Sequence, residues 1–328
     1  MRGIKLGIWI CIIFIVPILL MKWWWNSQIA PVSSAKEEKV IIVSKGDSFS
    51  QISDKLRENN LIRSTWAFKL EAKQQGVESR LKVGSFKISP ALSTDEILKI
   101  LTSNPQGIKV TLIEGWRVEE MADQLSLKFN LPAGRQEVQS SKFLVLAKEG
   151  YMFPDTYLFP EDVNIEQVVK TLRDNFDKKY TNDLKEKITK QGLTENQGVI
   201  LASIVEREAR SAEARRMVAS ILLKRFKISM GLNADATIQY ALGYQPSEKS
   251  WWKKDLSPDD LKIDSPFNTY LHVGLPPAPI CNPSLSSLEA VANADSSTPY
   301  LYYYHDSKGN SYYAETLDEH NMNVVNHP

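Results

Sequence analysis

The sequence contains few cysteines and histidines, and this limits the chemistry it can support. Cys11 and Cys281 are the only cysteines among 328 residues, and Cys11 lies in an apolar run. A framework of disulfides is therefore excluded. The four histidines are scattered and lack the close spacing that is typical of metal ligands. We expect no metal and no cofactor.

The sequence also lacks an excess of charge of one sign. The 40 lysines and arginines are balanced by 39 aspartates and glutamates, so that the net charge is +1. This balance gives no electrostatic case for nucleic acid as a partner. With 43% hydrophobic and 24% charged residues, the composition is that of a globular protein long enough for two or more domains.

One long apolar run stands at the amino terminus. Leu6 to Met21 is almost wholly apolar, and Lys22 and the tryptophans Trp23 to Trp25 follow it. The run approaches the ~20 residues that a membrane-spanning helix needs, and Trp and Lys are typical of its interfacial end. Because Arg2 and Lys5 precede the run, we expect a single-pass anchor in the cell (inner) membrane, with the amino terminus cytoplasmic and the bulk extracytoplasmic. A cleaved signal peptide is the alternative, but no clear cleavage site follows.

A strand-turn-helix pattern occurs twice in the first part of the chain. Val40 to Val43 predicts a strand, Gly46 a turn, and the apolar positions of residues 49–56 keep helical spacing. The same apolar offsets return around Gly115. Two copies are too few for a solenoid, so we expect two similar packing units. The turn cluster at residues 104–107 predicts a domain boundary between them.

The string from Val199 to Ala214 runs from hydrophobic residues straight into a charged cluster. Thr194 and Gln197 predict a capping box that opens a helix, and after Gly198 in its first turn no glycine or proline interrupts the pattern before Gly231. We therefore expect one continuous helix. Glu206 lies at the junction, where loss of hydration helps a carboxyl to keep its proton near neutral pH and to act as an acid.

Glu206 also has an ordinary structural interpretation. On a continuous helix it lies one turn before Arg210, and a glutamate paired with that arginine would be a common surface feature. This segment alone favours neither interpretation of Glu206, the catalytic acid or the surface ion pair.

Aromatic residues gather from Glu149 to Pro160, EGYMFPDTYLFP. The two prolines forbid a helix interior and predict a loop or an edge strand. Exposed rings there, including Tyr157, would suit a sugar-binding cleft, because the apolar face of a sugar stacks on aromatic side chains. A loop that fills the core is the alternative.

The carboxyl-terminal half offers further polar side chains. Asp235 is the best second carboxylate, although an aspartate at a helix start favours N-capping. Asn268 and Tyr270 carry donors and acceptors suited to the N-acetyl group or the hydroxyls of a sugar, and an ordinary turn would use them as well. Residues 301–316 predict a β-hairpin that turns at residues 307–310.

Three strings together resemble a known family. LASIVEREA at residues 201–209, SPFNTY at 265–270 and GLPPAPI at 274–280 are similar to those of the MltG-type, YceG-like endolytic murein transglycosylases. The resemblance covers roughly residues 40 to 325. It implies that Glu206, the glutamate of the LASIVE string, is the catalytic acid.

The sequence departs from the family pattern at three positions. Phe267 stands where the family usually has Tyr, Ala278 where Gly is usual, and Ala236 where Pro is usual. These departures concern fine substrate contacts rather than the reaction class. The candidate substrate-binding residues are Asp235, Asn268, Tyr270 and Tyr157.

The resemblance implies an enzyme that cuts peptidoglycan between N-acetylmuramic acid and N-acetylglucosamine and leaves 1,6-anhydro ends. One carboxyl suffices, because the 6-hydroxyl of the sugar attacks in place of water. Glu206 would protonate the leaving oxygen and then take the proton of that hydroxyl. We expect endolytic cleavage of nascent strands that ends their elongation.

Two other functions stay open at this stage. A conventional peptidoglycan hydrolase would pair Glu206 with Asp235 or Glu213, because such enzymes place two carboxylates across the bond. A non-catalytic, membrane-tethered protein could instead bind the cell wall.

The predicted fold class is α+β, with a transmembrane helix, a small α/β subdomain and a larger mixed domain. We expect a cytoplasmic tip and anchor at residues 1–26, a linker at 27–39, a first subdomain at 40–106 and a catalytic domain at 107–328. The first subdomain, closed by a strand near Ile88, resembles a peptidoglycan-binding LysM domain. The implied partners are glycan strands, the cell membrane and peptidoglycan synthases.

Overall fold

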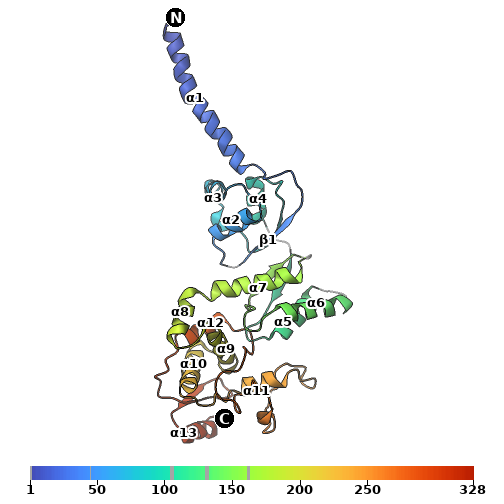
Figure 1. The fold of residues 1–328 in the computed structure, drawn as a ribbon, viewed down its shortest axis with the longest axis vertical. Helices are drawn as coiled ribbons and strands as arrows, with labels where there is room; N and C mark the ends of the chain where they lie inside the picture. The colour runs from blue at the N-terminus through green and yellow to red at the C-terminus, as the bar shows by residue number, and fades with distance from the viewer. Residues whose placement is uncertain (1, 45, 104–106, 130–132, 161–162) are drawn as a thin grey trace. The chain divides into compact units, whose positions relative to one another are not determined.

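The computed structural model describes residues 2–44, 46–103, 107–129, 133–160 and 163–328, without the side chains of residues 2–15 and 133–139. The chain forms two compact units (Figure 1). The first comprises Met1–Lys109 and Tyr157–Val163, and the second comprises Val110–Thr156 and Asn164–Pro328. The chain therefore returns to the first unit after it has begun the second.

The first unit combines helices with one antiparallel pair of strands. Its elements are α1 (Arg2–Ile29), β1 (Lys39–Val43), α2 (Phe49–Glu58), α3 (Thr65–Gln74), η1 (Glu78–Arg80), β2 (Gly84–Ile88) and α4 (Thr94–Thr102). In the sheet, Lys39 pairs with Ile88 and Val43 with Gly84. Capping boxes at Ser48 and Ser93 begin α2 and α4, because their hydroxyls bind amides that the helices leave free.

Phe68 lies at the centre of the first unit's core. Its side chain is fully buried and stacks on Phe49, with 5.5 Å between the ring centroids. Ile41 of β1, Leu56 of α2 and Ile97 of α4 belong to the same cluster. The strand and the helix predicted for the first strand-turn-helix pattern are thus confirmed, whereas the resemblance of this unit to a LysM domain stays a prediction.

The segment Tyr157–Val163 completes the first unit. The hydroxyl of Ser85 in β2 donates to the carbonyl of Leu158 at 2.8 Å. Gly107, with a φ of +154°, lies so close to Phe159 that a Cβ would stand 2.4 Å from its carbonyl oxygen. Only glycine fits this approach of one backbone to another.

The helix α1 covers the predicted membrane anchor, but most of that anchor falls among side chains outside the described part of the chain. Within the part that is described, no helix is both long enough and apolar enough to span a membrane. The helix runs on to Ile29, past the predicted start of the linker. The turn cluster at residues 104–106 also lies outside the described residues.

The second unit is mainly helical, and the mixed α+β class is confirmed. The division between the two units falls within the strands β3 (Ile108–Thr111) and β4 (Thr156–Phe159), which pair with each other. The further elements are α5 (Val118–Lys128), α6 (Ala133–Leu146), α7 (Ile165–Lys179), α8 (Asn182–Lys190), α9 (Glu195–Glu208), α10 (Ala212–Lys227), α11 (Asp235–Leu242), η2 (Asp260–Lys262), α12 (Leu285–Ala292), β5 (Tyr302–His305), β6 (Ser311–Ala314) and α13 (Leu317–Asn326). β5 and β6 form the predicted hairpin, in which Tyr302 pairs with Ala314.

The helix α9 is the centre of the second unit. Residues 198–205 are all buried, and α9 packs beside α10 and α12 (Figure 1). Burial on every side explains why this stretch is apolar all round. The predicted capping box is confirmed, because Thr194 accepts the amide of Gln197 at 3.2 Å and Gln197 accepts the amide of Thr194 at 2.9 Å.

The prediction of one continuous helix is wrong beyond Glu208. Ala209 is extended, with φ −136° and ψ 142°, and the hydroxyl of Ser211 begins α10 by accepting the amide of Ala214 at 3.1 Å. A serine cap offers the backbone an alternative to further helix, and it does so here without glycine or proline. Arg210 therefore lies between the two helices rather than one turn after Glu206.

The aromatic segment fills the cores, as the alternative interpretation proposed. Tyr151 and Phe153 in the second unit are 8% and 6% exposed, and Tyr157 and Phe159 in the first are 6% and 0% exposed. Such rings stabilise the fold by burying apolar area. They do not form an exposed platform for a sugar.

Gly150 allows this segment to enter the core of the second unit. Its φ is +84°, and a Cβ at this position would lie 2.5 Å from the ring of Pro279 and 3.1 Å from Val199. Gly192 provides a matched control, because its φ is +83° and nothing lies within 4 Å of the same point.

We predict that Gly150→Ala destabilises the protein much more than Gly192→Ala does. The left-handed backbone alone costs about 1–2 kcal/mol for an L-residue. The clash with a rigid proline ring should add about 1–3 kcal/mol at Gly150. Chemical denaturation of both variants measures the difference, and equal losses would contradict the assignment of a packing role to Gly150.

Candidate functional site

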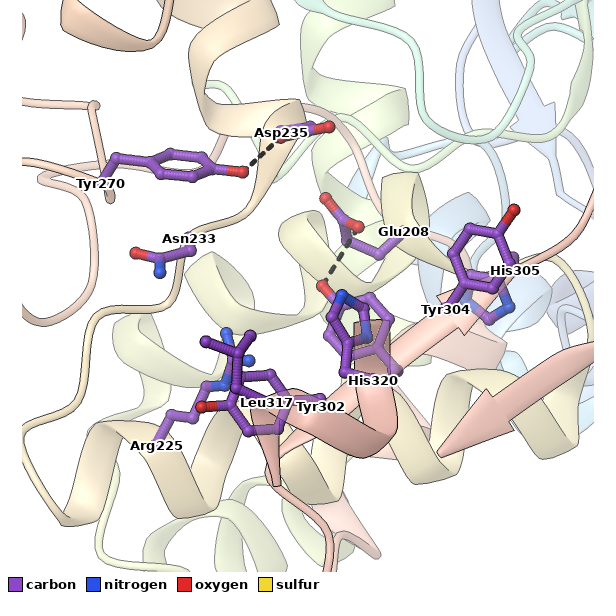
Figure 2. A pocket seen from close by; sticks show the side chains of 11 residues that line it. Glu208, Arg225, Asn233, Asp235, Tyr270, Tyr302, Tyr304, His305, Leu317 and His320 are labelled. Carbon is purple, nitrogen blue, oxygen red and sulfur yellow. Dashed lines mark hydrogen bonds between the residues drawn. The ribbon is translucent and has the colours of Figure 1, made fainter. Parts of the chain in front are cut away.

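A pocket with a volume of about 440 Å³ lies at the end of α9 in the second unit (Figure 2). Its walls come from α9, α10, α11, β5, α13 and the loops that carry Asn233 and Tyr270. The lining residues are Glu208, Arg225, Asn233, Asp235, Tyr270, Tyr302, Tyr303, Tyr304, His305, Leu317 and His320. The pocket thus combines two carboxyls with a wall of tyrosines.

Glu208 is the last residue of α9, and its side chain lines the pocket. The hydroxyl of Tyr303 donates to it at 3.1 Å, and the amide of Ala236 donates at 3.3 Å. Burial raises the pKa of Glu208 to about 7, and the nearby charge of Asp235 adds to this rise. A carboxyl with such a pKa is available in both its acid and its base form near neutral pH.

Asp235 lies across the pocket from Glu208 and is held by Tyr270 (Figure 2). The hydroxyl of Tyr270 donates to the Asp235 carboxylate at 2.6 Å. The prediction that Asp235 caps a helix is wrong, because Ala234 is the N-cap of α11 and makes no side-chain bond there. Thr269 fixes this turn instead, since its hydroxyl accepts the amide of Ala234 at 3.0 Å.

Glu206 lies two residues earlier in α9, about half a turn away on the opposite side of the helix, and its carboxylate accepts from other donors. Arg215 of α10 donates to one oxygen at 2.7 Å, and the side chain of Glu206 is only 4% exposed. The other oxygen accepts the amide and the hydroxyl of Ser284 at 2.8 and 2.5 Å and the hydroxyl of Ser287 at 2.7 Å. These are the contacts of a carboxylate that joins helices, and Glu206 does not line the pocket.

Two more of the predicted substrate-binding residues have structural contacts. Asn268 is fully buried, and its amide nitrogen donates to the carbonyls of Leu261 and Ile263 at 3.0 and 2.9 Å. The side-chain oxygen of Asn268 accepts the amide of Tyr270 at 2.9 Å. Tyr157 belongs to the first unit, where it is buried and stacks on Phe159 at 5.6 Å. Of the predicted residues, the pocket therefore brings together Asp235 and Tyr270.

The sequence interpretation missed the wall that the hairpin provides. Arg225 is 5% exposed, and its Nε and Nη1 donate to the carbonyls of Leu301 and Leu232 at 2.7 and 2.8 Å. Its guanidinium lies 5.1 Å from the ring centroid of Tyr302. Burial lowers the pKa of His305 and of His320, so that both imidazoles favour the neutral form.

The run of tyrosines at residues 302–304 is the sequence signal that could have pointed to this wall of the pocket. Four tyrosines, at 302–304 and 270, line the same pocket, and an aromatic, hydrogen-bonding surface of this kind suits a sugar ring. Within the described part of the chain, no group of three or more His, Cys, Asp or Glu residues could hold a metal ion.

A family model covers nearly the whole chain outside α1. The model of the YceG-like family matches residues 41–326. The chain belongs to this family.

Named relatives are similar to this YceG-like chain over most of its length. The endolytic murein transglycosylase of Bacillus subtilis (strain 168) is 30% identical over 322 residues, which cover 90% of this chain and 87% of that protein. The endolytic murein transglycosylase of Streptococcus pneumoniae serotype 2 is 29% identical over 90% of this chain, and the match spans 59% of that longer protein.

A solved structure agrees with the fold. The crystal structure of a YceG-like protein from Listeria monocytogenes is 30% identical in sequence and has a TM-score of 0.55. The match covers 88% of this chain and 99% of that one.

We predict that Arg215→Met destabilises this YceG-like protein by about 3–5 kcal/mol, because it leaves the Glu206 carboxylate buried without its cation. Lys170→Met is the matched control, since its pair with Asp174 joins side chains that are 73% and 57% exposed. Loss of that exposed pair should cost less than about 1 kcal/mol. Chemical denaturation measures both, and a small loss for Arg215→Met would contradict the structural role of Glu206.

We also predict a pH-dependent gain in stability for Glu208→Gln. The pKa of Glu208 is raised from 4.5 to about 7, so the wild type loses stability as the pH rises through this window, while glutamine does not ionise. Relative to the wild type, the variant should gain up to about 3 kcal/mol between acid pH and a pH above 7. Unfolding free energies measured across the range test this, and a difference that does not change with pH would contradict it.

Proposed function

We propose that this protein is a lytic transglycosylase that cleaves peptidoglycan glycan strands between N-acetylmuramic acid and N-acetylglucosamine and leaves 1,6-anhydro ends. Membership of the YceG-like family and the names of the two relatives support the reaction class. The observation that carries the proposal is the pocket, in which one carboxyl with a pKa of about 7 faces a wall of tyrosines.

In this proposal Glu208 is the catalytic acid and base. A lytic transglycosylase has to protonate the leaving oxygen and then accept the proton of the 6-hydroxyl that attacks the anomeric carbon. A pKa of about 7 keeps a large fraction of Glu208 in each form near neutral pH. Because the attacking hydroxyl belongs to the substrate, the reaction gains from proximity and needs no second carboxylate as nucleophile.

The family resemblance pointed to Glu206, and the contacts of that residue argue against this role. Its oxygens accept hydrogen bonds from Arg215, Ser284 and Ser287, so a substrate would have to displace a buried ion pair to reach it. Glu208 lies two residues later and lines the pocket.

Asp235 has a positioning role in this mechanism. Its negative charge raises the pKa of Glu208, and the hydrogen bond from Tyr270 fixes its carboxylate in the pocket. Tyr270 and the tyrosines of β5 would contact the sugar rings through their faces and hydroxyls.

A conventional hydrolase is the second candidate, because the pocket holds Asp235 as well as Glu208. The two reactions differ by one water in the product. Digestion of purified peptidoglycan followed by mass spectrometry distinguishes them, since hydrolysis adds 18 mass units (one water) and transglycosylation adds none.

We predict that Glu208→Gln lowers turnover at least ~10,000-fold, because one group serves both half-steps. Glu206→Gln should be destabilised yet keep most of its turnover per folded molecule. The digest gives the turnover of each variant, and circular dichroism gives its folded fraction. If Glu206→Gln is folded and inactive while Glu208→Gln cuts normally, the assignment is wrong and the original prediction from the sequence is right.

We further propose that α1 anchors the protein in the cell membrane with both units outside the cytoplasm, on the strength of the apolar run at residues 6–21 and of Arg2 and Lys5. The first unit would hold glycan near the membrane as a LysM-like unit. Cleavage within nascent strands would end their elongation, with peptidoglycan synthases as partners.

A further inference from the structure

Tryptophans at the end of α1 meet Trp66 of α3 within the first unit. Trp66 of α3 lies 6.3 Å from Trp24 and 5.8 Å from Trp25, measured between ring centroids. Trp23, Trp24 and Trp66 are 70%, 47% and 57% exposed. Exposed tryptophans are costly in water, and a cluster of them indicates a surface that another phase or molecule covers.

The outward face of α3 extends this cluster with positive charge. Trp66, Lys69 and Lys73 follow one another at helical spacing, opposite the buried residues Ala67 and Phe68. Lys73 is exposed, and the half-buried Lys69 donates one Nζ hydrogen to the hydroxyl of Ser50 at 2.8 Å, which leaves two for a phosphate. Aromatic rings with lysines beside them match the headgroup layer of a bilayer, where the ring lies at the apolar boundary and the ammonium meets phosphate.

The chain after α1 is bound to the first unit and does not act as a free tether. The Nε and Nη2 of Arg63 donate to the carbonyl of Pro31 at 2.9 and 2.7 Å. The amide of Ser33 donates to the carbonyl of Pro90 at 3.1 Å, and the hydroxyl of Ser89 donates to the carbonyl of Ala35 at 2.9 Å. These bonds fix the position of α3 relative to the end of α1.

We infer that Trp66, Lys69 and Lys73 form a membrane-contact face, which docks the first unit on the bilayer surface beside the anchor. The inference rests on the proposed anchoring of α1, because an inserted helix would place Trp23 to Trp25 in the headgroup layer. Trp66 packs on two of these rings and must then lie at the same depth. The occupant is a phospholipid surface, and a glycan strand stacked on Trp66 is the alternative outcome.

The test uses the full chain in phosphatidylcholine vesicles whose acyl chains carry bromine near the headgroup. Bromine quenches the fluorescence of a tryptophan that it contacts. The fluorescence of the wild type minus that of Trp66→Phe gives the signal of Trp66. We expect the brominated lipid to reduce this signal about twofold or more, as for an interfacial ring. The signal isolated by Trp252→Phe should not change, because the Trp252 ring is only 8% exposed and cannot contact the bromine.

Flotation and glycan cleavage on the same samples separate the possible failures. A protein that floats and cuts but shows an unquenched Trp66 overturns the membrane-contact face and leaves the proposed function standing. A protein that cuts but does not float overturns both the anchor and the face. Quenching of Trp66 by soluble glycan and not by lipid would assign this face to the glycan strand.

The charge of the face is tested separately. Adding phosphatidylglycerol should increase the quenching of Trp66, and Lys69→Glu combined with Lys73→Glu should remove this increase. Lys308→Glu in the hairpin of the second unit is the control, and this variant should still show the increase in Trp66 quenching when phosphatidylglycerol is added. If the double variant responds to the anionic lipid as the wild type does, the lysines take no part in docking.

Discussion

The carboxylate of Glu206 joins three helices of the second unit at one point. It comes from α9, its cation comes from α10, and its three other donors come from the first turn of α12 and the cap before it. A carboxylate buried to this extent is stable only when donors surround it. The positions of α10 and α12 beside α9 therefore depend on this one group, and so does the direction in which α9 ends.

The end of α9 is what produces the site. Because the helix stops at Glu208 and α10 begins at Ser211, α10 folds back and brings Arg215 to Glu206. The same turn leaves Glu208 facing the pocket, where the amide of Ala236 in α11 and the hydroxyl of Tyr303 donate to it. Glu206 and Glu208 are thus two residues apart in sequence and have different surroundings. Glu206 is held by an arginine and three neutral donors, whereas Glu208 accepts two neutral donors and lines the pocket.

Local patterns in the sequence predicted the local structure well. The capping box at Thr194, the strand before Gly46 and the hairpin of β5 and β6 follow from residue types a few positions apart. The break at Ala209 was not predictable in this way, because no glycine or proline marks it. The partner of Glu206 was also hidden, since Arg210 is the neighbour that helical spacing suggests and Arg215 is the one that the turn supplies.

The site residues depended on contacts between distant segments. Asn268 has the side chain of a sugar-binding residue, yet its donors and acceptors are used within its own loop. Tyr157 is an aromatic of the right kind, but it lies in a core. Glu208 acquires its raised pKa from burial and from Asp235 of another helix, and neither cause can be read from the residues beside it.

The return of the chain to the first unit affects the order in which the protein can fold. Ser85 has its partner at Leu158, and Gly107 packs against Phe159, so the first unit lacks part of its structure until Val163 has been synthesised. Domains generally fold in order as the chain emerges. Here much of α5, α6 and the aromatic segment of the second unit must emerge before the first unit is complete, which couples the folding of the two units during synthesis.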